Sequence, residues 1–235
     1  MSESPASGWD RVLAASIHLQ RLVPDAVLVG GSAAALHVRH RLSLDDDHVV
    51  RDLVERFDEV LEALEATDGW ITSRVKRPVL ILGSLEGVET GIRQLIRQRP
   101  LEVEELATRS GSIRVPTLPE MARIKAWLVL KRNATRDFLD FAALADRLGP
   151  DAPSVVIGMD DYYIDQRGPG GRRIATQVAK QLAEPAPYDL SEIDLRHYRG
   201  LLPRWQDWPE VATVCRQVAI AVLAEAASQE EPQPG

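Results

Sequence analysis

Residues 26–47 read Ala26-Val-Leu-Val-Gly-Gly-Ser-Ala-Ala-Ala-Leu-His-Val-Arg-His-Arg-Leu-Ser-Leu-Asp-Asp-Asp47. The four apolar residues at 26–29 predict a short buried strand, which the two following glycines interrupt. The alanine-rich residues 32–40 favour a helix, with Ser32 at its start as the N-cap. A second strand is expected at residues 44–50. In this order a glycine turn precedes the predicted helix, and a run of aspartates follows the loop after the helix.

The glycine turn suits a phosphate group. Gly30 and Gly31 allow the backbone to approach a phosphate closely, and the N-terminus of the following helix favours anions. The hydroxyl of Ser32 can donate a hydrogen bond to a phosphate oxygen. Taken alone, a Gly-Gly-Ser sequence is more often a plain turn than a phosphate site.

The aspartate run supplies a metal site if it lies on a strand. Side chains alternate along a strand, so Asp45 and Asp47 project to one face and Asp46 to the other. Two carboxylates on one face suit Mg²⁺, which takes its remaining ligands from water and substrate phosphates. Three consecutive aspartates are usually a solvated loop, but the neighbouring glycine turn reverses that preference. Together the two elements predict a site for a metal–triphosphate complex and attack on the α-phosphate.

The remaining pattern predicts an α/β (α+β) fold: a mixed sheet with flanking helices in residues 1–116, followed by a helical half in residues 117–235. Helical spacing of apolar residues and strand-like runs predict the following elements: helices at 9–21, 51–67, 101–107, 118–131, 136–148, 174–184 and 208–228, and strands at 70–75, 78–83, 87–96 and 112–115. The polar ends, residues 1–8 and 228–235, are expected to be disordered.

Composition limits the class of protein. The chain has 235 residues, 45% of them apolar and 27% charged, which is ordinary for a globular protein. A net charge of −7 argues against coating nucleic acid by bulk electrostatics, although Arg93, Arg97 and Arg99 could form a local basic groove. The single cysteine, Cys215, excludes an internal disulfide. The N-terminus lacks the basic start and apolar run of a secretory signal, and no run of about 18 apolar residues is present. We therefore expect a cytoplasmic protein without membrane association.

A second pair of charged residues lies in apolar surroundings. Lys125 falls in the apolar stripe of its predicted helix, and Asp140 stands between Leu139 and Phe141 on the next. Buried charges are rare unless they are paired or bind a ligand. Two interpretations therefore stay open: an ion pair between Lys125 and Asp140 that joins two helices, or contacts from each residue to a substrate.

The segment from Gly30 to Asp47 resembles the first motif of the nucleotidyltransferases related to polymerase β. It is most similar to the AbiEii/AbiGii toxin group, whose members read Gly-Gly-Ser/Thr-Ala and then His-Arg-x-Ser-x-Asp-x-Asp. The resemblance implies a nucleotidyltransferase-like fold, Mg²⁺ bound by the two aspartates, and a nucleoside triphosphate (NTP) held by the glycine turn and the residues between. The positions that carry this match are Gly30, Gly31, Ser32, His40, Arg41, Ser43, Asp45 and Asp47.

Residues 121–144 are similar to the second block of the same family, in which a lysine precedes Arg-x-x-x-Lys-Asp-x-x-Asp-Leu. The resemblance implies that Lys125 contacts nucleotide phosphate and that Asp140 is needed for activity, with Arg132 and Asp137 as further candidates. Arg136 stands where the family has its lysine.

This chain departs from the family at the third acidic residue. The family's Gly-Val-x-Val-Asp segment corresponds to Gly87-Val-Glu-Thr-Gly91, which puts Gly91 where a carboxylate is expected. Glu89 has the same strand parity and is predicted to point toward Asp45 and Asp47 in its place. Asp140 is the alternative, and otherwise the site binds nucleotide without a proton acceptor. Asp46 is a smaller departure, because that position is usually apolar in the family.

The resulting hypothesis is a Mg²⁺-dependent enzyme that moves a nucleoside monophosphate from an NTP to an acceptor hydroxyl. The family resemblance suggests a toxin of a toxin–antitoxin or phage-defence pair, with an RNA or tRNA end as acceptor and a cognate antitoxin as partner. Two alternatives remain: a small-molecule nucleotidyltransferase, and a degenerate nucleotide-binding or partner-binding module without transferase activity. Gly91 motivates the second of these.

Overall fold

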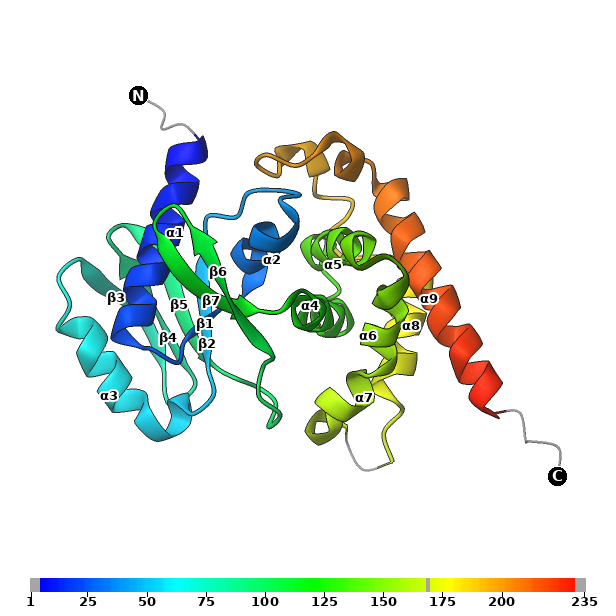
Figure 1. Ribbon diagram of the computed structural model, residues 1–235, viewed down its shortest axis with the longest axis horizontal. Coiled ribbons are helices and arrows are strands. Elements are labelled where there is room, and N and C mark those ends of the chain that lie inside the picture. The colour runs from blue at the N-terminus through cyan, green and yellow to red at the C-terminus, as the bar shows by residue number, and fades with distance from the viewer. Residues whose placement is uncertain (1–4, 168–169, 231–235) are drawn as a thin grey trace. The chain divides into compact units, whose positions relative to one another are not determined.

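The computed structural model describes residues 5–167 and 170–230. The chain divides between Thr117 and Leu118 into two compact units. The N-terminal unit combines helices with two β-sheets, and the C-terminal unit is helical (Figure 1). The predicted α/β class with a helical C-terminal half is confirmed.

The elements of the N-terminal unit follow the order expected from the glycine turn and the strands around it. They are α1 (Pro5–Leu22), β1 (Val27–Leu28), α2 (Gly30–Val38), β2 (Asp46–Val50), α3 (Leu53–Glu65), β3 (Trp70–Lys76), β4 (Leu80–Leu85), β5 (Val88–Gln94), β6 (Val103–Thr108) and β7 (Gly111–Pro116).

Five strands form one mixed sheet in the order β1-β2-β5-β4-β3. Strands β3, β4 and β5 are an antiparallel meander, and β2 joins it by parallel pairing with β5. The amphipathic helix α3 buries Leu53, Phe57 and Val60 in one cluster with Ile81 and Ile92 of the sheet. The parallel pairing of β2 with β5 places their residues side by side, so paired residues of both strands share one face.

The predicted helix at residues 101–107 is wrong. Residues Val103–Thr108 form β6, which pairs with β7 in a separate two-stranded antiparallel sheet. Glu104, Glu105 and Leu106 suit a helix in isolation, but β7 supplies a complete ladder of backbone partners for this segment. The fully buried side chains of β7, Ile113 and Val115, lie opposite Leu106 and Glu104. Tertiary pairing therefore overrides the local helix propensity.

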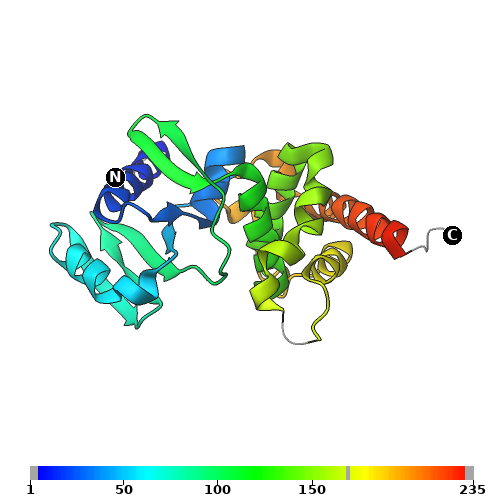
Figure 2. The ribbon, with the colours of Figure 1, turned by 60° about the horizontal axis from the view of Figure 1, so that its bottom comes forward.

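The C-terminal unit contains the four predicted helices and two short ones that the sequence pattern did not reveal. The predicted helices are α4 (Leu118–Arg132), α5 (Thr135–Leu148), α8 (Ile174–Ala183) and α9 (Trp208–Glu230), and the short ones are α6 (Ala152–Ile157) and α7 (Met159–Tyr162). Helix α5 contacts both α4 and α9, and α9 also contacts α8 (Figure 2). Phe138 and Phe141 of α5 are completely buried in this arrangement.

The two ends are more helical than expected. Helix α1 already begins at Pro5, within the segment predicted to be disordered, and residues 1–4 lie outside the described residues. Helix α9 continues to Glu230, and residues 231–235 of the predicted tail also lie outside them.

One helix of the described residues has the length and apolar composition of a membrane span. It covers Trp208–Ser228, with a mean hydropathy of 1.4 and 39% of the segment buried. The segment has no uninterrupted run of about 18 apolar residues, because Glu210, Arg216 and Glu225 break it. Core helices of many water-soluble proteins meet the same criterion, so length and composition alone assign no membrane role.

Candidate functional site

The glycine turn lies directly against the second metal-ligand candidate. The amide of Val29 donates to the carbonyl of Asp47 at 2.8 Å, which joins the end of β1 to β2. Gly30 follows with a φ of +74°, a backbone conformation that side chains other than glycine rarely adopt. A Cβ on Gly30 would lie 3.6 Å from Oδ2 of Asp47. The chain therefore brings the start of α2 to the carboxylate of Asp47.

Gly31 is packed under the loop that leads into β2. A Cβ at this position would lie 2.5 Å from Nη2 of Arg41 and 2.6 Å from Oγ of Ser43. Such distances leave no room for a side chain, so glycine is required if the loop is to close over α2. Arg41 and Ser43 are each 7% exposed. Three residues that the family resemblance assigns to nucleotide binding are thus in contact.

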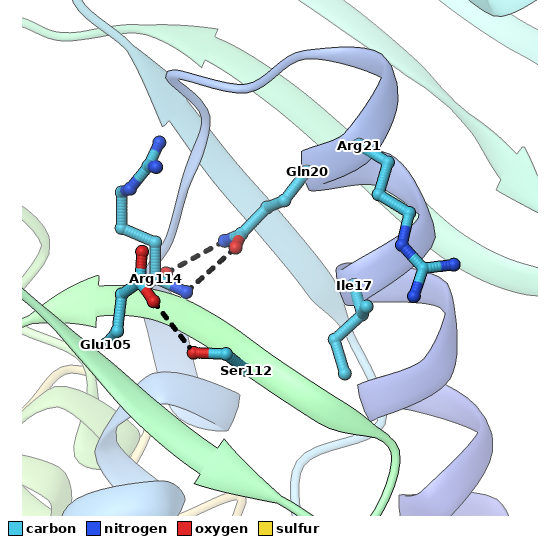
Figure 3. A pocket seen from close by; sticks show the side chains of 6 residues that line it. All are labelled: Ile17, Gln20, Arg21, Glu105, Ser112 and Arg114. Atoms are coloured by element: carbon cyan, nitrogen blue, oxygen red, sulfur yellow. Dashed lines mark hydrogen bonds between the residues drawn. The ribbon is translucent and has the colours of Figure 1, made fainter.

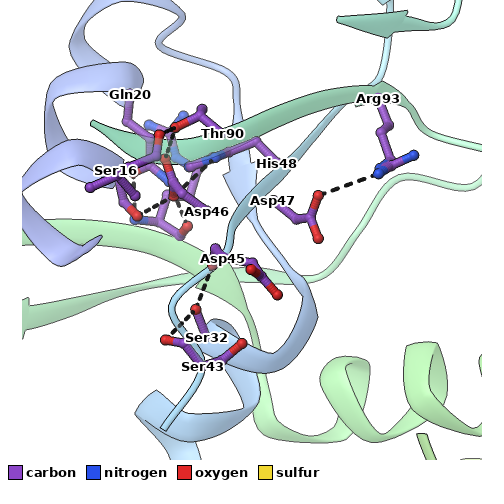
Figure 4. Close-up of polar contacts among 12 residues, drawn as sticks. Ser16, Gln20, Ser32, Ser43, Asp45, Asp46, Asp47, His48, Thr90 and Arg93 are labelled. Carbon is purple, nitrogen blue, oxygen red and sulfur yellow. Dashed lines mark hydrogen bonds and ion pairs between the residues drawn. The ribbon is translucent and has the colours of Figure 1, made fainter. Parts of the chain in front are cut away.

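Ser32 does not cap α2, contrary to the prediction. It is the third residue of the helix, whose N-cap is Val29. Its buried hydroxyl donates to the backbone carbonyl of Asp45 at 2.6 Å and lies 3.2 Å from that of Ser43 (Figure 4). Ser32 therefore fixes the loop before β2, and its contact with a phosphate remains a prediction.

The alternation predicted for the three aspartates is confirmed. Asp45 is exposed just before β2, the Asp47 side chain is 37% exposed, and Asp46 and His48 are buried. Figure 4 shows Asp45 and Asp47 turned away from the cluster that surrounds Asp46. Two carboxylates are accordingly available to a ligand at the start of β2.

Asp46 anchors β2 from the opposite face. Ser16 of α1 donates a hydrogen bond to its Oδ1, and Thr90 of β5 donates to Oδ2 at 3.3 Å. Nδ1 of His48 lies 3.4 Å from Oδ1. Burial raises the pKa of Asp46 to about 7 against these hydrogen bonds, and burial lowers the pKa of His48 to about 3. An aspartate at this usually apolar position is explained by its polar partners on α1 and β5.

Gly91 lies beside Asp47, at the position where the family has its third carboxylate. The two residues are Cα partners in the parallel pairing of β2 and β5. Nη2 of Arg93, two positions along β5, lies 3.6 Å from Oδ1 of Asp47. Sequence reasoning did not assign Arg93 to the site. Its parity with Gly91 indicates a shared sheet face, but only the register of β2 with β5 brings Arg93 to Asp47.

The second predicted constellation is a buried ion cluster. Nζ of Lys125 on α4 lies 2.7 Å from Oδ2 of Asp140 and 3.1 Å from Oδ1 of Asp137, both on α5. The lysine side chain is 4% exposed and both carboxylates are 0% exposed. The interhelical ion pair is therefore present, with Asp137 as an additional partner. Arg132 is exposed in the last turn of α4.

No family model matches the chain. Curated relatives include the MmpL11 proteins of Mycobacterium tuberculosis, named a heme uptake protein, and of Mycobacterium bovis, named a probable transport protein. Each is 37% identical over 132 residues, which is 55% of this chain and 13% of the relative. The chain thus spans a small part of the length of these relatives.

Two of the solved structures that resemble this chain cover nearly all of it. A putative nucleotidyltransferase from Helicobacter pylori aligns with a TM-score of 0.55 at 14% identity, over 99% of this chain and 100% of that one. JHP933 from the same organism gives 0.54 at 14% identity, over 97% of each chain. The antibiotic-resistance factor ANT(2'')-Ia gives 0.50 at 11% identity, over 66% of this chain and 93% of that one. The chain has the nucleotidyltransferase-like fold.

In this nucleotidyltransferase-like fold, the available donors fit one Mg²⁺ ion. Asp45 and Asp47 provide two hard oxygen ligands, and Mg²⁺ usually binds through one or two carboxylates plus water and phosphate. Glu89 is exposed on the same sheet face as Gly91 and Asp47. Residues 5–167 and 170–230 contain no group of three or more His, Cys, Asp or Glu side chains placed to hold a metal. The role of Glu89 as replacement carboxylate remains a prediction.

A cavity of about 200 Å³ lies elsewhere in the same unit, between α1 and the β6–β7 hairpin (Figure 3). The amide of Gln20 pairs with both backbone groups of Arg114, at 2.8 Å each, and so borders the edge of β7. None of the predicted site residues lines this cavity, whose walls are Ile17, Gln20, Arg21, Glu105, Ser112 and Arg114.

Proposed function

We propose that the chain is a nucleotidyltransferase that moves a nucleoside monophosphate from an NTP to an acceptor hydroxyl, with Mg²⁺ at Asp45 and Asp47. The observation that carries this proposal is the meeting of the Gly30–Gly31 turn with the carboxylate of Asp47. A phosphate-binding turn and a metal-binding carboxylate then face the same ligand. The nucleotidyltransferase-like fold supports the proposal.

Each residue has a definite role in this reaction. The backbone of Gly30 and Gly31 receives the triphosphate at the N-terminus of α2, while Ser32 and Ser43 hold the loop that presents Asp45. Asp45 and Asp47 would hold the Mg²⁺, which would supply neutralising charge for the phosphates and the leaving pyrophosphate.

The acceptor oxygen bonds to the α-phosphorus as the bond to the bridging oxygen breaks and pyrophosphate leaves. The hydroxyl proton passes to a carboxylate, for which Glu89 is the candidate. Asp140 does not suit this role, because its side chain is 0% exposed and ion-paired with Lys125.

The resemblance to the AbiEii-type group supports a toxin role, with an RNA or tRNA end as acceptor, a cognate antitoxin as partner and a cytoplasmic location. The net charge of −7 requires a local basic surface for RNA, and Arg93 on β5 lies next to Asp47. Because the chain spans 13% of the MmpL11 relatives, we do not carry the transport functions in their names over to it.

The test is incubation of the purified chain with each labelled NTP and total RNA, with and without Mg²⁺. We expect label in RNA only with Mg²⁺ and the wild-type chain, and none with Asp47→Asn. Small hydroxylated molecules, including aminoglycosides, form a second acceptor arm. Label in that arm alone would replace the RNA proposal with small-molecule modification. Absence of product in both arms, despite NTP binding, would contradict the transferase.

The position of Gly91 favours a second candidate function, a nucleotide-binding or partner-binding module without transfer. The family's third carboxylate is missing beside Asp47, and two carboxylates are enough to bind a metal–nucleotide complex without activating an acceptor. Calorimetric binding of Mg²⁺–NTP by a chain that forms no product with any acceptor would support this module.

A further inference from the structure

The carboxylate of Asp47 occupies space that a side chain at position 91 would need. A Cβ on Gly91 would lie 2.9 Å from Oδ1 of Asp47 and 3.0 Å from Cδ2 of Leu82. The carboxylate of Asp47 therefore occupies space that opens because residue 91 is glycine. Oδ1 of Asp47 therefore lies next to Gly91, its partner residue on β5.

The guanidinium of Arg93 lies close to this carboxylate oxygen. Oδ1 is the oxygen that lies 3.6 Å from Nη2 of Arg93 (Figure 4). Arg93 shares the sheet face of Gly91 and Asp47, because positions 91 and 93 have the same parity. The side chains of Arg93 and Asp47 are 43% and 37% exposed, so a ligand from solvent can reach both. Gly91 and the guanidinium of Arg93 thus both lie next to the carboxylate of Asp47.

We infer that Arg93 is a built-in cation of the nucleotide site, which limits the site to one divalent ion and contacts the triphosphate. In the free protein Arg93 neutralises Asp47. Asp45 and Asp47 would hold a divalent ion in competition with the guanidinium, and Arg93 would then pair with a phosphate oxygen. Guanidinium groups bind phosphate through several parallel hydrogen bonds, which suits this position. This inference rests on the proposed nucleotide site and identifies how its charge is balanced.

Arg93 therefore has opposite effects on the two ligands, which a structural residue would not have. Removing it removes a competitor of the metal and also removes a phosphate contact. Because the pair with Asp47 is partly exposed, we expect Arg93→Gln to tighten binding of Mn²⁺ alone by roughly two- to fivefold. The same variant should bind triphosphate in Mg²⁺ about ten- to a hundredfold more weakly, as expected for loss of a charge-assisted hydrogen bond.

The experiment uses the full chain and two probes. Electron paramagnetic resonance counts bound Mn²⁺ without nucleotide, and calorimetry measures each of the four ribonucleoside triphosphates in Mg²⁺. We expect one Mn²⁺ in the wild type, the opposite shifts in Arg93→Gln, and a return to wild-type Mn²⁺ affinity in Arg93→Lys. Arg74→Gln is the matched control, since Arg74 is exposed on β3 of the same sheet. It should change neither measurement.

Two Mn²⁺ ions in the wild type, or an Arg93→Gln variant with both affinities unchanged, would overturn the inference while leaving the proposed function intact. Weakening of both ligands in Arg93→Gln would also overturn it, because that result indicates a structural role. A wild type that binds Mn²⁺ but no NTP would contradict the proposed function, and the Mn²⁺ comparison would still decide whether Arg93 competes for Asp47. A wild type that binds neither probe would overturn both.

Discussion

Nζ of Lys125 lies 2.7 Å from Oδ2 of Asp140, and neither side chain is more than 4% exposed. Asp137 adds a second carboxylate at 3.1 Å from the same ammonium. One cation thus serves two buried anions, and Oδ2 of Asp137 has no hydrogen-bond partner among the described residues. In this arrangement the lysine joins α4 to α5, which agrees with the structural interpretation of the second motif.

Lys125→Met should therefore destabilise the protein. It leaves two carboxylates buried without their cation, and loss of one partner of a buried pair typically costs about 3–5 kcal/mol. Urea denaturation followed by circular dichroism measures the change in the free energy of unfolding. Lys180→Met on α8 is the control, because Lys180 is exposed and the substitution should change stability by less than about 0.5 kcal/mol. If Lys125→Met keeps its stability but loses NTP affinity, Lys125 is a phosphate ligand instead.

Asp45→Asn and Asp47→Asn should abolish Mg²⁺-dependent NTP binding without unfolding the chain. Both side chains reach solvent, so removing their charge costs little stability, whereas the triphosphate loses the metal that balances it. Calorimetry with and without Mg²⁺, together with a melting curve, tests both statements. Asp68→Asn, an exposed aspartate of the same unit, should bind like the wild type. Unchanged Mg²⁺–NTP affinity in both site variants would contradict the metal assignment.

Local patterns in the sequence were sufficient for the features that depend on alternation. The opposite directions of Asp46 and Asp47 follow from strand periodicity, and the structure confirms them. The contact of Asp47 with Arg93 could not be predicted, because it depends on the register of β2 with β5. In that register Asp46 is paired with Thr90, and Asp47 with Gly91. The helix expected at 101–107 failed for the same reason, since only pairing with β7 reveals a strand there.

Gly31→Ala should disrupt the loop over α2. Its Cβ would meet Nη2 of Arg41 at 2.5 Å and Oγ of Ser43 at 2.6 Å, and both side chains are buried, so they cannot move into solvent without cost. We expect a loss of stability of roughly 1–3 kcal/mol and a loss of NTP affinity. Gly158→Ala is the control, because its nearest neighbour would be 3.4 Å away and its φ of −69° suits alanine. A Gly31→Ala variant as stable and as tight in NTP binding as Gly158→Ala would show that the close packing is unimportant.

The buried pair of Asp46 and His48 predicts how stability depends on pH. The pKa of Asp46 is about 7 in the folded chain, against an ordinary value of 3.8. Between pH 3.8 and about 7 the folded state therefore binds a proton that the unfolded state has released. Its contribution to stability is present below about pH 4 and is lost as the pH rises through 7. The pKa of His48 is about 3 against 6.5 ordinarily, so its contribution has the opposite sign and is lost as the pH falls from 6.5 toward 3.

Asp46→Asn separates the contributions of Asp46 and His48 to stability, because it removes the titrating carboxyl group and leaves the imidazole of His48 in place. The free energy of unfolding of the variant, relative to the wild type, should increase between pH 4 and pH 8. The increase should be on the order of 1–4 kcal/mol, since one pKa unit corresponds to about 1.4 kcal/mol. Urea denaturation at pH 4, 5, 6, 7 and 8 gives the two curves, with Asp68→Asn as a variant whose curve should stay parallel to the wild type. If the Asp46→Asn curve is parallel as well, Asp46 titrates alike in the folded and unfolded chain. The hydrogen bonds from Ser16 and Thr90 would then offset its burial completely.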